Sequence, residues 1–280
     1  MKKFLIVDGS NLLFQMFYGM PARIINKDGK AIQGTLGFVG ALLKIIRMVE
    51  PSHVAVLFDG ACANDRIAVN VDYKANRIDY SEVPEEENPF SQIDDVYHAL
   101  TFLGIKHAET TVCETDDWIA GYALNKTEDT EMVISSFDSD FFQLITDKVS
   151  VLRYRGDKTI ICTPEYIREK LGIEPYRYAD FKSLTGDTAD NIKGADKVGP
   201  KTAAVLMNEF GNLENLLVNA EQIKKPSVRN SIIANTERLR DNYRIIKLSG
   251  EAELPFAIDE LAYNDSGITT NEVLQGIGLK

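Results

Sequence analysis

The chain has 280 residues, of which 44% are hydrophobic and 26% charged, and its net charge is −11. These values are typical of a globular enzyme built as one large domain or as a core with a smaller lobe. The cysteines Cys62, Cys113 and Cys162 are far apart and form no CxxC pair, so the sequence predicts neither a disulfide framework nor a thiolate zinc site, and a cytoplasmic protein is expected. No apolar run approaches the ~18 residues of a membrane span.

The acidic net charge argues at first against a nucleic-acid partner, because phosphate binding usually requires a basic surface. The charges are unevenly distributed, however. Residues 191–247 contain ten basic and six acidic residues, whereas residues 81–95 contain six acids and no base. The sequence is therefore acidic in its first part and basic further on, and DNA binding is not excluded.

Short apolar runs rich in β-branched residues alternate with helical patterns along the first half of the chain. Residues 34–49 carry apolar side chains at helical spacing, and residues from about 164 onward show mostly helical patterns. This alternation predicts an α/β fold with a central, mainly parallel sheet wrapped by helices. The predicted strands are Phe4–Val7, Val54–Phe58, Met132–Ser135 and Val149–Leu152.

Residues 60–88 interrupt this alternation with polar, charged and turn-forming residues. The segment is longer than an ordinary connection between a strand and a helix. Such an insertion is usually a functional loop or lid, or else partly disordered.

Carboxylates follow three of the predicted strands. Asp8 ends the first strand, Asp59 ends the second, and Asp138 and Asp140 lie shortly after the third. Because the carboxyl ends of parallel strands share one edge of the sheet, where ligands bind, these side chains are expected to lie together.

Two further acidic groups could join them. Glu114, Asp116 and Asp117 stand at the expected start of a helix, and Asp187 and Asp190 lie in the stretch TGDTADN. Taken alone, each acid fits an ordinary turn or a helix cap. Nine carboxylates can converge only if some are protonated or cations lie among them. Oxygen ligands without histidine or thiolate favour two Mg²⁺ or Mn²⁺ ions rather than zinc.

Residues 194–211 combine glycines, a proline and a helix of small residues. Pro200 is suited to the first turn of a helix, so the free N–H groups after Gly199, with Lys201 and Thr202 beside them, predict an anion site for a phosphate. An ordinary helical hairpin with a capping glycine is the alternative.

Six motifs in order resemble the 5′ nuclease domain of bacterial DNA polymerase I and its stand-alone flap endonuclease relatives. They are VDGSNLLF, FDG with YKANR, ETDD, SSFDSDFFQLI, LTGDTADNIKG and VGPKTAAVL. The resemblance covers nearly the whole chain. It implies a metal-dependent nuclease core at residues 1–185, with a helical arch at residues 60–92, and an all-helical lobe at residues 186–280 that contains a helix-hairpin-helix.

The resemblance also implies roles for individual residues. Asp8, Asp59, Glu114, Asp116 and Asp117 would form one metal site, and Asp138, Asp140, Asp187 and Asp190 the second. Lys74 and Arg77 of the arch would neutralise the scissile phosphate, with Arg66 contacting DNA and Tyr73 offering a stacking face to an unpaired base. The alternatives are surface ion pairs for the bases and a packed ring for Tyr73. Gly194, Gly199, Lys201 and Thr202 would grip the duplex backbone, with a monovalent cation such as K⁺ at the hairpin.

The implied activity is that of a flap endonuclease or 5′-3′ exonuclease, which cuts DNA near junctions of single and double strands in replication or repair. RNA-primed strands are a further expected substrate, and the protein is expected to act alone as a monomer without a polymerase domain. Gln15 stands where the family usually has a basic residue, so a DNA-binding paralogue with little or no cleavage is one alternative. A PIN-like ribonuclease is another.

Overall fold

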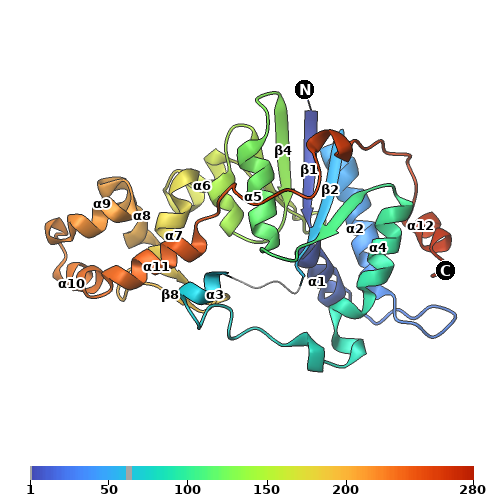
Figure 1. Ribbon diagram of the computed structural model, residues 1–280, viewed down its shortest axis with the longest axis horizontal. Helices are drawn as coiled ribbons and strands as arrows, with labels where there is room; N and C mark the ends of the chain where they lie inside the picture. Colours follow the sequence, from blue (N-terminus) through green and yellow to red (C-terminus); the bar gives the residue numbers. More distant parts are fainter. Residues whose placement is uncertain (1, 61–64) are drawn as a thin grey trace.

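A six-stranded sheet forms the centre of the molecule in the computed structural model, which describes residues 2–60 and 65–280. Cys62 and the other residues of 61–64 in the predicted arch lie outside the described residues. The strand order is β3-β2-β1-β4-β5-β6, and only β6 runs antiparallel to its neighbour (Figure 1). The strands are β1 (Lys2–Asp8), β2 (His53–Phe58), β3 (Lys106–Glu109), β4 (Thr130–Ser135), β5 (Val149–Arg153) and β6 (Ile160–Cys162).

The four predicted strands and the predicted parallel sheet are confirmed. The sequence patterns missed β3 and β6 for physical reasons. The sequence of β3, Lys-His-Ala-Glu, has no apolar run, and none of its residues is fully buried. The short strand β6 forms the edge of the sheet, and Ile160 and Ile161 are exposed.

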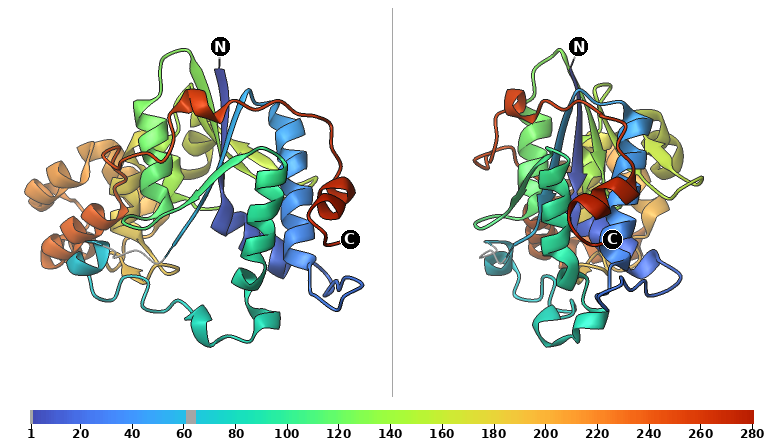
Figure 2. Two further views of the ribbon diagram at one scale, coloured as in Figure 1. Left: turned by 45° about the vertical axis from the view of Figure 1, so that its right-hand side comes forward. Right: turned by 90° about the vertical axis from the view of Figure 1, so that its right-hand side faces the viewer.

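Both faces of the sheet are buried, as expected for parallel strands covered by helices. Along β1, Leu5 and Val7 pack into a core on one face, and Phe4 and Ile6 pack into a core on the other. The first face is covered by α1 (Gly9–Gly19), α2 (Gln33–Val49) and α4 (Ile93–Phe102), and the second by α5 (Thr115–Asn125) (Figure 2). The predicted helix over residues 34–49 is confirmed as α2.

A helical lobe lies beside the sheet, and its core is continuous with the core on the second face (Figure 1). Its helices are α6 (Pro164–Leu171), α7 (Tyr178–Thr185), α8 (Pro200–Phe210), α9 (Leu213–Val218), α10 (Pro226–Ala234) and α11 (Thr236–Ile246). Between α7 and α8, the strands β7 (Gly186–Asp187) and β8 (Ile192–Lys193) pair as a small hairpin. The stretch TGDTADN thus lies at a hairpin and not at the start of a helix.

The end of the chain leaves the lobe and returns to the sheet, contrary to the expectation of one lobe over residues 186–280. Ala262 forms an isolated bridge with His53 of β2. Helix α12 (Thr270–Gly276) then packs Val273 against Val39 and Leu43 of α2. The apolar side chains of α2 and α12 cover each other, and this burial explains the return.

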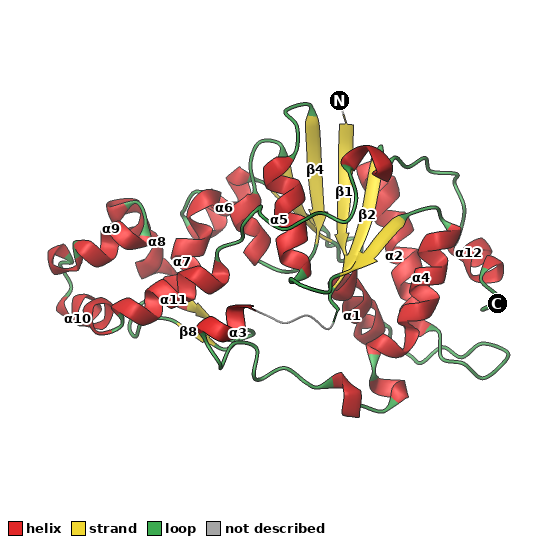
Figure 3. Ribbon diagram, viewed as in Figure 1, coloured by secondary structure: helices red, strands yellow, loops and turns green. Residues whose placement is uncertain are grey.

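Residues 70–92, called the strap below, connect the lobe to the sheet layer across the carboxyl ends of the strands (Figure 3). The strap follows the short helix α3 (Asp65–Val69), and its only helical parts are the 3₁₀ turns η1 (Tyr80–Glu82), η2 (Glu85–Glu87) and η3 (Pro89–Gln92). The predicted arch therefore contains little regular helix among its described residues, since its two prolines interrupt helices and neighbouring like charges repel each other in a helix. None of the described helices is long and apolar enough to cross a membrane.

Candidate active site

A cleft of about 1010 Å³ lies between the carboxyl ends of the strands and the strap. Asp8 at the end of β1, Asp59 after β2 and Asp138 after β4 line it, together with Glu114 and Asp116 from the start of α5. Strand order reverses at β1, because the chain adds β2 and β3 on one side and β4 and β5 on the other. Ligands of open α/β sheets bind at such a point. The structure therefore brings together five of the nine predicted metal ligands along one cleft.

Local hydrogen bonds fix the strand-end carboxylates. Asp8 caps α1 by accepting from the N–H of Asn11 at 3.0 Å, and its other oxygen accepts from the Ser136 hydroxyl at 2.8 Å. Asp59 accepts from the N–H of Thr115 at 3.0 Å, which ties the end of β2 to the start of α5. The caps and turns suggested as alternatives to metal binding are therefore present, but each carboxylate keeps acceptor capacity toward the cleft.

The electrostatics of the cleft favour a cation. Burial, together with the charges of Asp59 and Asp138, raises the pKa of Asp8 to about 7. Burial and the carboxylates of Asp138 and Asp59 raise the pKa of Asp116 well above its usual value. Among the described residues, no lysine or arginine forms an ion pair with Asp8, Asp59, Asp116 or Asp138. The donor set consists of oxygens and suits a hard divalent ion.

As the side chains stand in residues 2–60 and 65–280, no three acidic, histidine or cysteine groups are arranged to share one ion. Several of the predicted ligands form ion pairs with basic side chains instead. Arg66 contacts Glu114 and lies 2.7 Å from Asp117, and Lys74 Nζ lies 2.5 Å from Glu114 Oε1. Basic groups thus occupy part of the space in which the sequence predicts metal ions.

The late acids are neutralised in the same way. Asp140 contacts Lys182, a lysine of α7 that is 5% exposed and also lies 2.5 Å from Asp187. Arg77 Nη2 lies 2.8 Å from Asp190 Oδ1. In the metal-free protein these side chains neutralise Asp187 and Asp190, and the binding of a metal ion by the two carboxylates stays a prediction.

The strap is attached to the TGDTADN hairpin by backbone and side-chain contacts. The N–H of Lys74 donates to the Asp190 carbonyl at 3.1 Å, Asn76 donates to the Thr188 carbonyl at 3.1 Å, and Asn191 donates to the Asp72 carbonyl at 2.8 Å. Lys74 and Asn191 both have positive φ, a conformation that asparagine tolerates better than lysine does. Two segments more than a hundred residues apart are thus joined, and the strap lines the cleft.

Tyr73 and Arg66 make contacts within the protein. Tyr73 is 5% exposed and packs against Ala179, Ile245 and Ile246 of the lobe, as the packed-ring alternative expected. Tyr73 also lines the cleft, and its stacking on an unpaired base stays a prediction. Arg66 forms ion pairs with Glu114 and Asp117 at the start of α5.

Both segments of the protein match known families. Residues 3–172 match the model of the 5'-3' exonuclease N-terminal resolvase-like domain, and residues 173–268 match that of the 5'-3' exonuclease C-terminal SAM fold. A 5'-3' exonuclease of Aquifex aeolicus is 30% identical over 263 residues, which are 93% of this chain and 86% of that protein. The chain belongs to the 5'-3' exonuclease family. The resemblance found in the sequence is confirmed, while a division after residue 185 stays a prediction.

Other relatives of this 5'-3' exonuclease family member are much longer or share mainly the fold. Thermostable DNA polymerase I of Thermus filiformis is 35% identical over 259 residues, but the chain spans only 30% of that protein. The flap endonuclease of bacteriophage T5, solved in a complex with DNA and metal ions, has a TM-score of 0.71 at 22% identity, covering 88% of this chain and 89% of that one.

The predicted phosphate site of this family member lies in the lobe. Gly199 precedes α8 without a side-chain cap, Pro200 is in the first turn, and Lys201 is exposed beside it. Gly194 has a structural role, because a Cβ there would lie 2.4 Å from the Leu184 carbonyl oxygen. The DNA contacts of Gly194, Gly199, Lys201 and Thr202 stay predictions.

Two residues in the site were not identified from the sequence as ligands or contacts. Lys182 was missed because a lysine inside a helix gives no local signal, although it lies five residues before Asp187. Ser136, which donates to Asp8 and accepts from the N–H of Asp138, follows β4 directly. Gln15, where the family usually has a base, donates to the Tyr154 carbonyl at 2.6 Å.

Proposed function

We propose that the protein is a divalent-metal-dependent 5′ nuclease that hydrolyses DNA phosphodiesters at junctions of single and double strands. The observation that carries this proposal is the cleft itself. Four carboxylates without an ion-pair partner among the described residues, those of Asp8, Asp59, Asp116 and Asp138, line it from separate segments. Membership in the 5'-3' exonuclease family and the T5 flap endonuclease, which was solved with DNA and metal ions, support it.

Two Mg²⁺ or Mn²⁺ ions are the proposed cofactors. Asp8, Asp59 and Asp116 would hold one ion with Glu114 and Asp117, and Asp138 would hold the other with Asp140, Asp187 and Asp190. When bound, such ions lower the pKa of water for attack and stabilise the leaving oxygen of a phosphodiester. The five other proposed ligands can join only if the basic side chains that they now contact share or release them; these ligands are Glu114, Asp117, Asp140, Asp187 and Asp190.

The strap supplies positive charge to the same cleft. Lys74 and Arg77 both line it, opposite the strand-end carboxylates. Their proposed role is to orient and neutralise the scissile phosphate, whose charge would otherwise be repelled by the surrounding acids. Burial lowers the pKa of Lys74, and the carboxylate of Asp116 opposes this effect.

The lobe provides the proposed duplex contact. The free N–H groups at the start of α8 and the exposed Lys201 suit a backbone phosphate, which carries no sequence information. A K⁺ ion at this hairpin, RNA-primed strands as substrates, a monomeric state and a cytoplasmic location are predictions from the sequence alone.

A cleavage assay tests the proposal. A duplex with a 5′-labelled single-stranded flap is incubated in Mg²⁺ or Mn²⁺, and binding of the same DNA is measured in Ca²⁺. Cleavage near the junction is expected. Binding without product in either catalytic metal would favour the DNA-binding paralogue, and faster cleavage of unstructured RNA than of the flap would favour a ribonuclease.

A further inference from the structure

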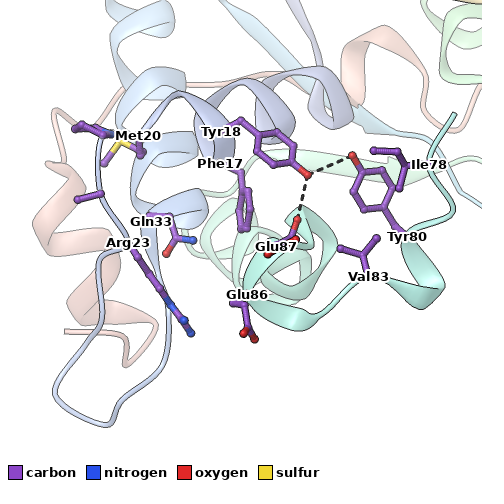
Figure 4. Close-up of a pocket in the computed structure, with 12 residues that line it drawn as sticks. Phe17, Tyr18, Met20, Arg23, Gln33, Ile78, Tyr80, Val83, Glu86 and Glu87 are labelled. Carbon is purple, nitrogen blue, oxygen red and sulfur yellow. Dashed lines mark hydrogen bonds between the residues drawn. The ribbon is translucent and has the colours of Figure 1, made fainter.

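A second pocket lies beside the cleft, further along α1. It has a volume of about 500 Å³ and is formed by the end of α1, the loop that follows and strap residues 78–87 (Figure 4). Ile78 and Tyr80 line both this pocket and the cleft, so the two cavities adjoin. We call it the aromatic pocket after the rings of Phe17, Tyr18 and Tyr80. Its size lies within the range of small-ligand sites.

The aromatic walls are held in place by contacts between α1 and the strap. The Tyr18 and Tyr80 hydroxyls lie 3.3 Å apart, and Tyr18 donates to the Glu87 carbonyl at 3.0 Å (Figure 4). Phe14 packs edge-on against both tyrosine rings. Tyr18 nevertheless remains 56% exposed. The pocket thus offers aromatic surface that is already positioned for a flat ligand.

One wall carries a buried acceptor to which no group in the described part of the chain donates. Gln33, the first residue of α2, lines the pocket and is 5% exposed, and its Oε1 has no hydrogen-bond partner among the described residues. An unpaired buried carbonyl oxygen costs free energy that a ligand N–H group would recover. The Gln33 carbonyl oxygen therefore favours a ligand that has an N–H donor on its edge.

The charges at the rim are separated. Arg23 lies on the side of Gln33, is exposed, and forms no ion pair within the described part of the chain. Glu86 and Glu87 lie on the strap side. A ligand with a negatively charged group would be attracted at Arg23 and repelled at the strap. Flat rings, an N–H donor and an attached phosphate are together the features of a nucleotide.

We propose that the aromatic pocket binds one unpaired base of the DNA single strand that passes the strap. The amino group of this base donates a hydrogen bond to Gln33, and the phosphate of the same nucleotide lies near Arg23. This inference rests on the proposed nuclease function, because that function brings a single strand to the adjoining cleft. Stacking between aromatic rings tolerates any base, while the Gln33 contact favours adenine over a base without the amino group.

Equilibrium binding of modified flaps tests the inference. Fluorescence anisotropy is measured in EDTA and in Ca²⁺ with flap duplexes in which one flap nucleotide at a time is abasic. At one position the abasic substitution should weaken binding about five- to hundredfold, the usual range for loss of one stacked base. At that position, replacing adenine by purine, which lacks only the amino group, should weaken binding about three- to tenfold in the wild type and not in Gln33→Leu.

Matched variants complete the test. Arg23→Gln should weaken binding, whereas Lys27→Gln in the same loop and Gln275→Leu on α12 should not. Equal losses at every flap position, or an equal purine effect in wild type and Gln33→Leu, overturn the inference. If unmodified flaps are cleaved in Mg²⁺ while no position effect is found, only this inference fails. If no flap is bound or cut, the proposed function fails with it.

Discussion

The ammonium group of Lys182 lies 2.5 Å from the Asp187 carboxylate, and it also contacts Asp140. Burial by itself lowers the pKa of such an ammonium group, but Asp140, Tyr178 and Asp138 together outweigh this effect and raise the pKa of Lys182. Burial likewise opposes ionisation of Asp187, yet Lys182 keeps the pKa of that carboxyl below its usual value. A metal ion at these two carboxylates must therefore share them with a buried cation.

Replacing Lys182 should destabilise the metal-free protein. Lys182→Met leaves the buried Asp140 and the partly buried Asp187 without an ion-pair partner, and breaking a buried pair in this way typically costs about 3 kcal/mol or more. Urea unfolding in EDTA measures the loss, with Lys193→Met, an exposed lysine in β8, as the control. Mg²⁺ should restore part of the stability. A loss no larger than that of the control would show that the pair does not stabilise the fold.

The paired acids of the TGDTADN hairpin should be required for cleavage but not for DNA binding. For Asp187→Ala/Asp190→Ala we expect cleavage to fall by several orders of magnitude, a loss of roughly 4 kcal/mol or more of transition-state stabilisation. Single-turnover rates and anisotropy with the same flap duplex separate the two effects. Asp196→Ala, an exposed acid nearby in sequence, is the control. A rate within tenfold of the wild type would remove these residues from the metal site.

Loosening the strap should expose it to proteases. Asn76→Ala/Arg77→Ala removes one hydrogen bond and one partly exposed ion pair to the hairpin, so cleavage by chymotrypsin within residues 70–92 should accelerate about five- to tenfold. Glu85→Ala changes the strap without touching the hairpin and should leave the rate unchanged. Equal rates in both variants would mean that other contacts hold the strap.

The stability of the metal-free protein should depend on pH through Asp8. The folded pKa of about 7 lies above the unfolded value near 4, so the folded state binds more protons and this group lowers stability as pH rises between the two values. Asp8→Asn mimics the protonated form. In EDTA it should stabilise the protein by roughly 2 to 4 kcal/mol above pH 7 and by almost nothing near pH 4. A gain that is independent of pH would contradict this assignment.

Lys201 should contribute to binding without sequence preference. Removing one phosphate contact by Lys201→Ala should weaken binding equally for flaps of different sequence and reduce the slope of log K against log salt by about one. Lys126 follows α5, at the end of the sheet that lies away from the cleft, and Lys126→Ala should change neither the affinity nor the salt dependence. A loss that depends on the duplex sequence would point to a base contact instead.

The local sequence predicted the parts of the site that follow from strand and helix patterns. Asp8, Asp59 and Asp138 could be placed together because each follows an apolar run that forms a buried parallel strand, and parallel strands end on one edge. Regular periodicity likewise predicted α2. The strap could not be predicted in this way, since its conformation depends on docking against a hairpin more than a hundred residues away.

The sequence by itself determined the parallel sheet, the family and the identity of the acidic residues, because these depend on short-range patterns and ordered motifs. Only the tertiary structure decided which charges meet. It placed Lys182 between Asp140 and Asp187, Arg77 on Asp190 and Tyr73 in the interior. It also left Gln33, in the lining of the aromatic pocket, without a donor from residues 2–60 or 65–280. Such pairings depend on how distant segments pack, and local sequence carries no signal for them.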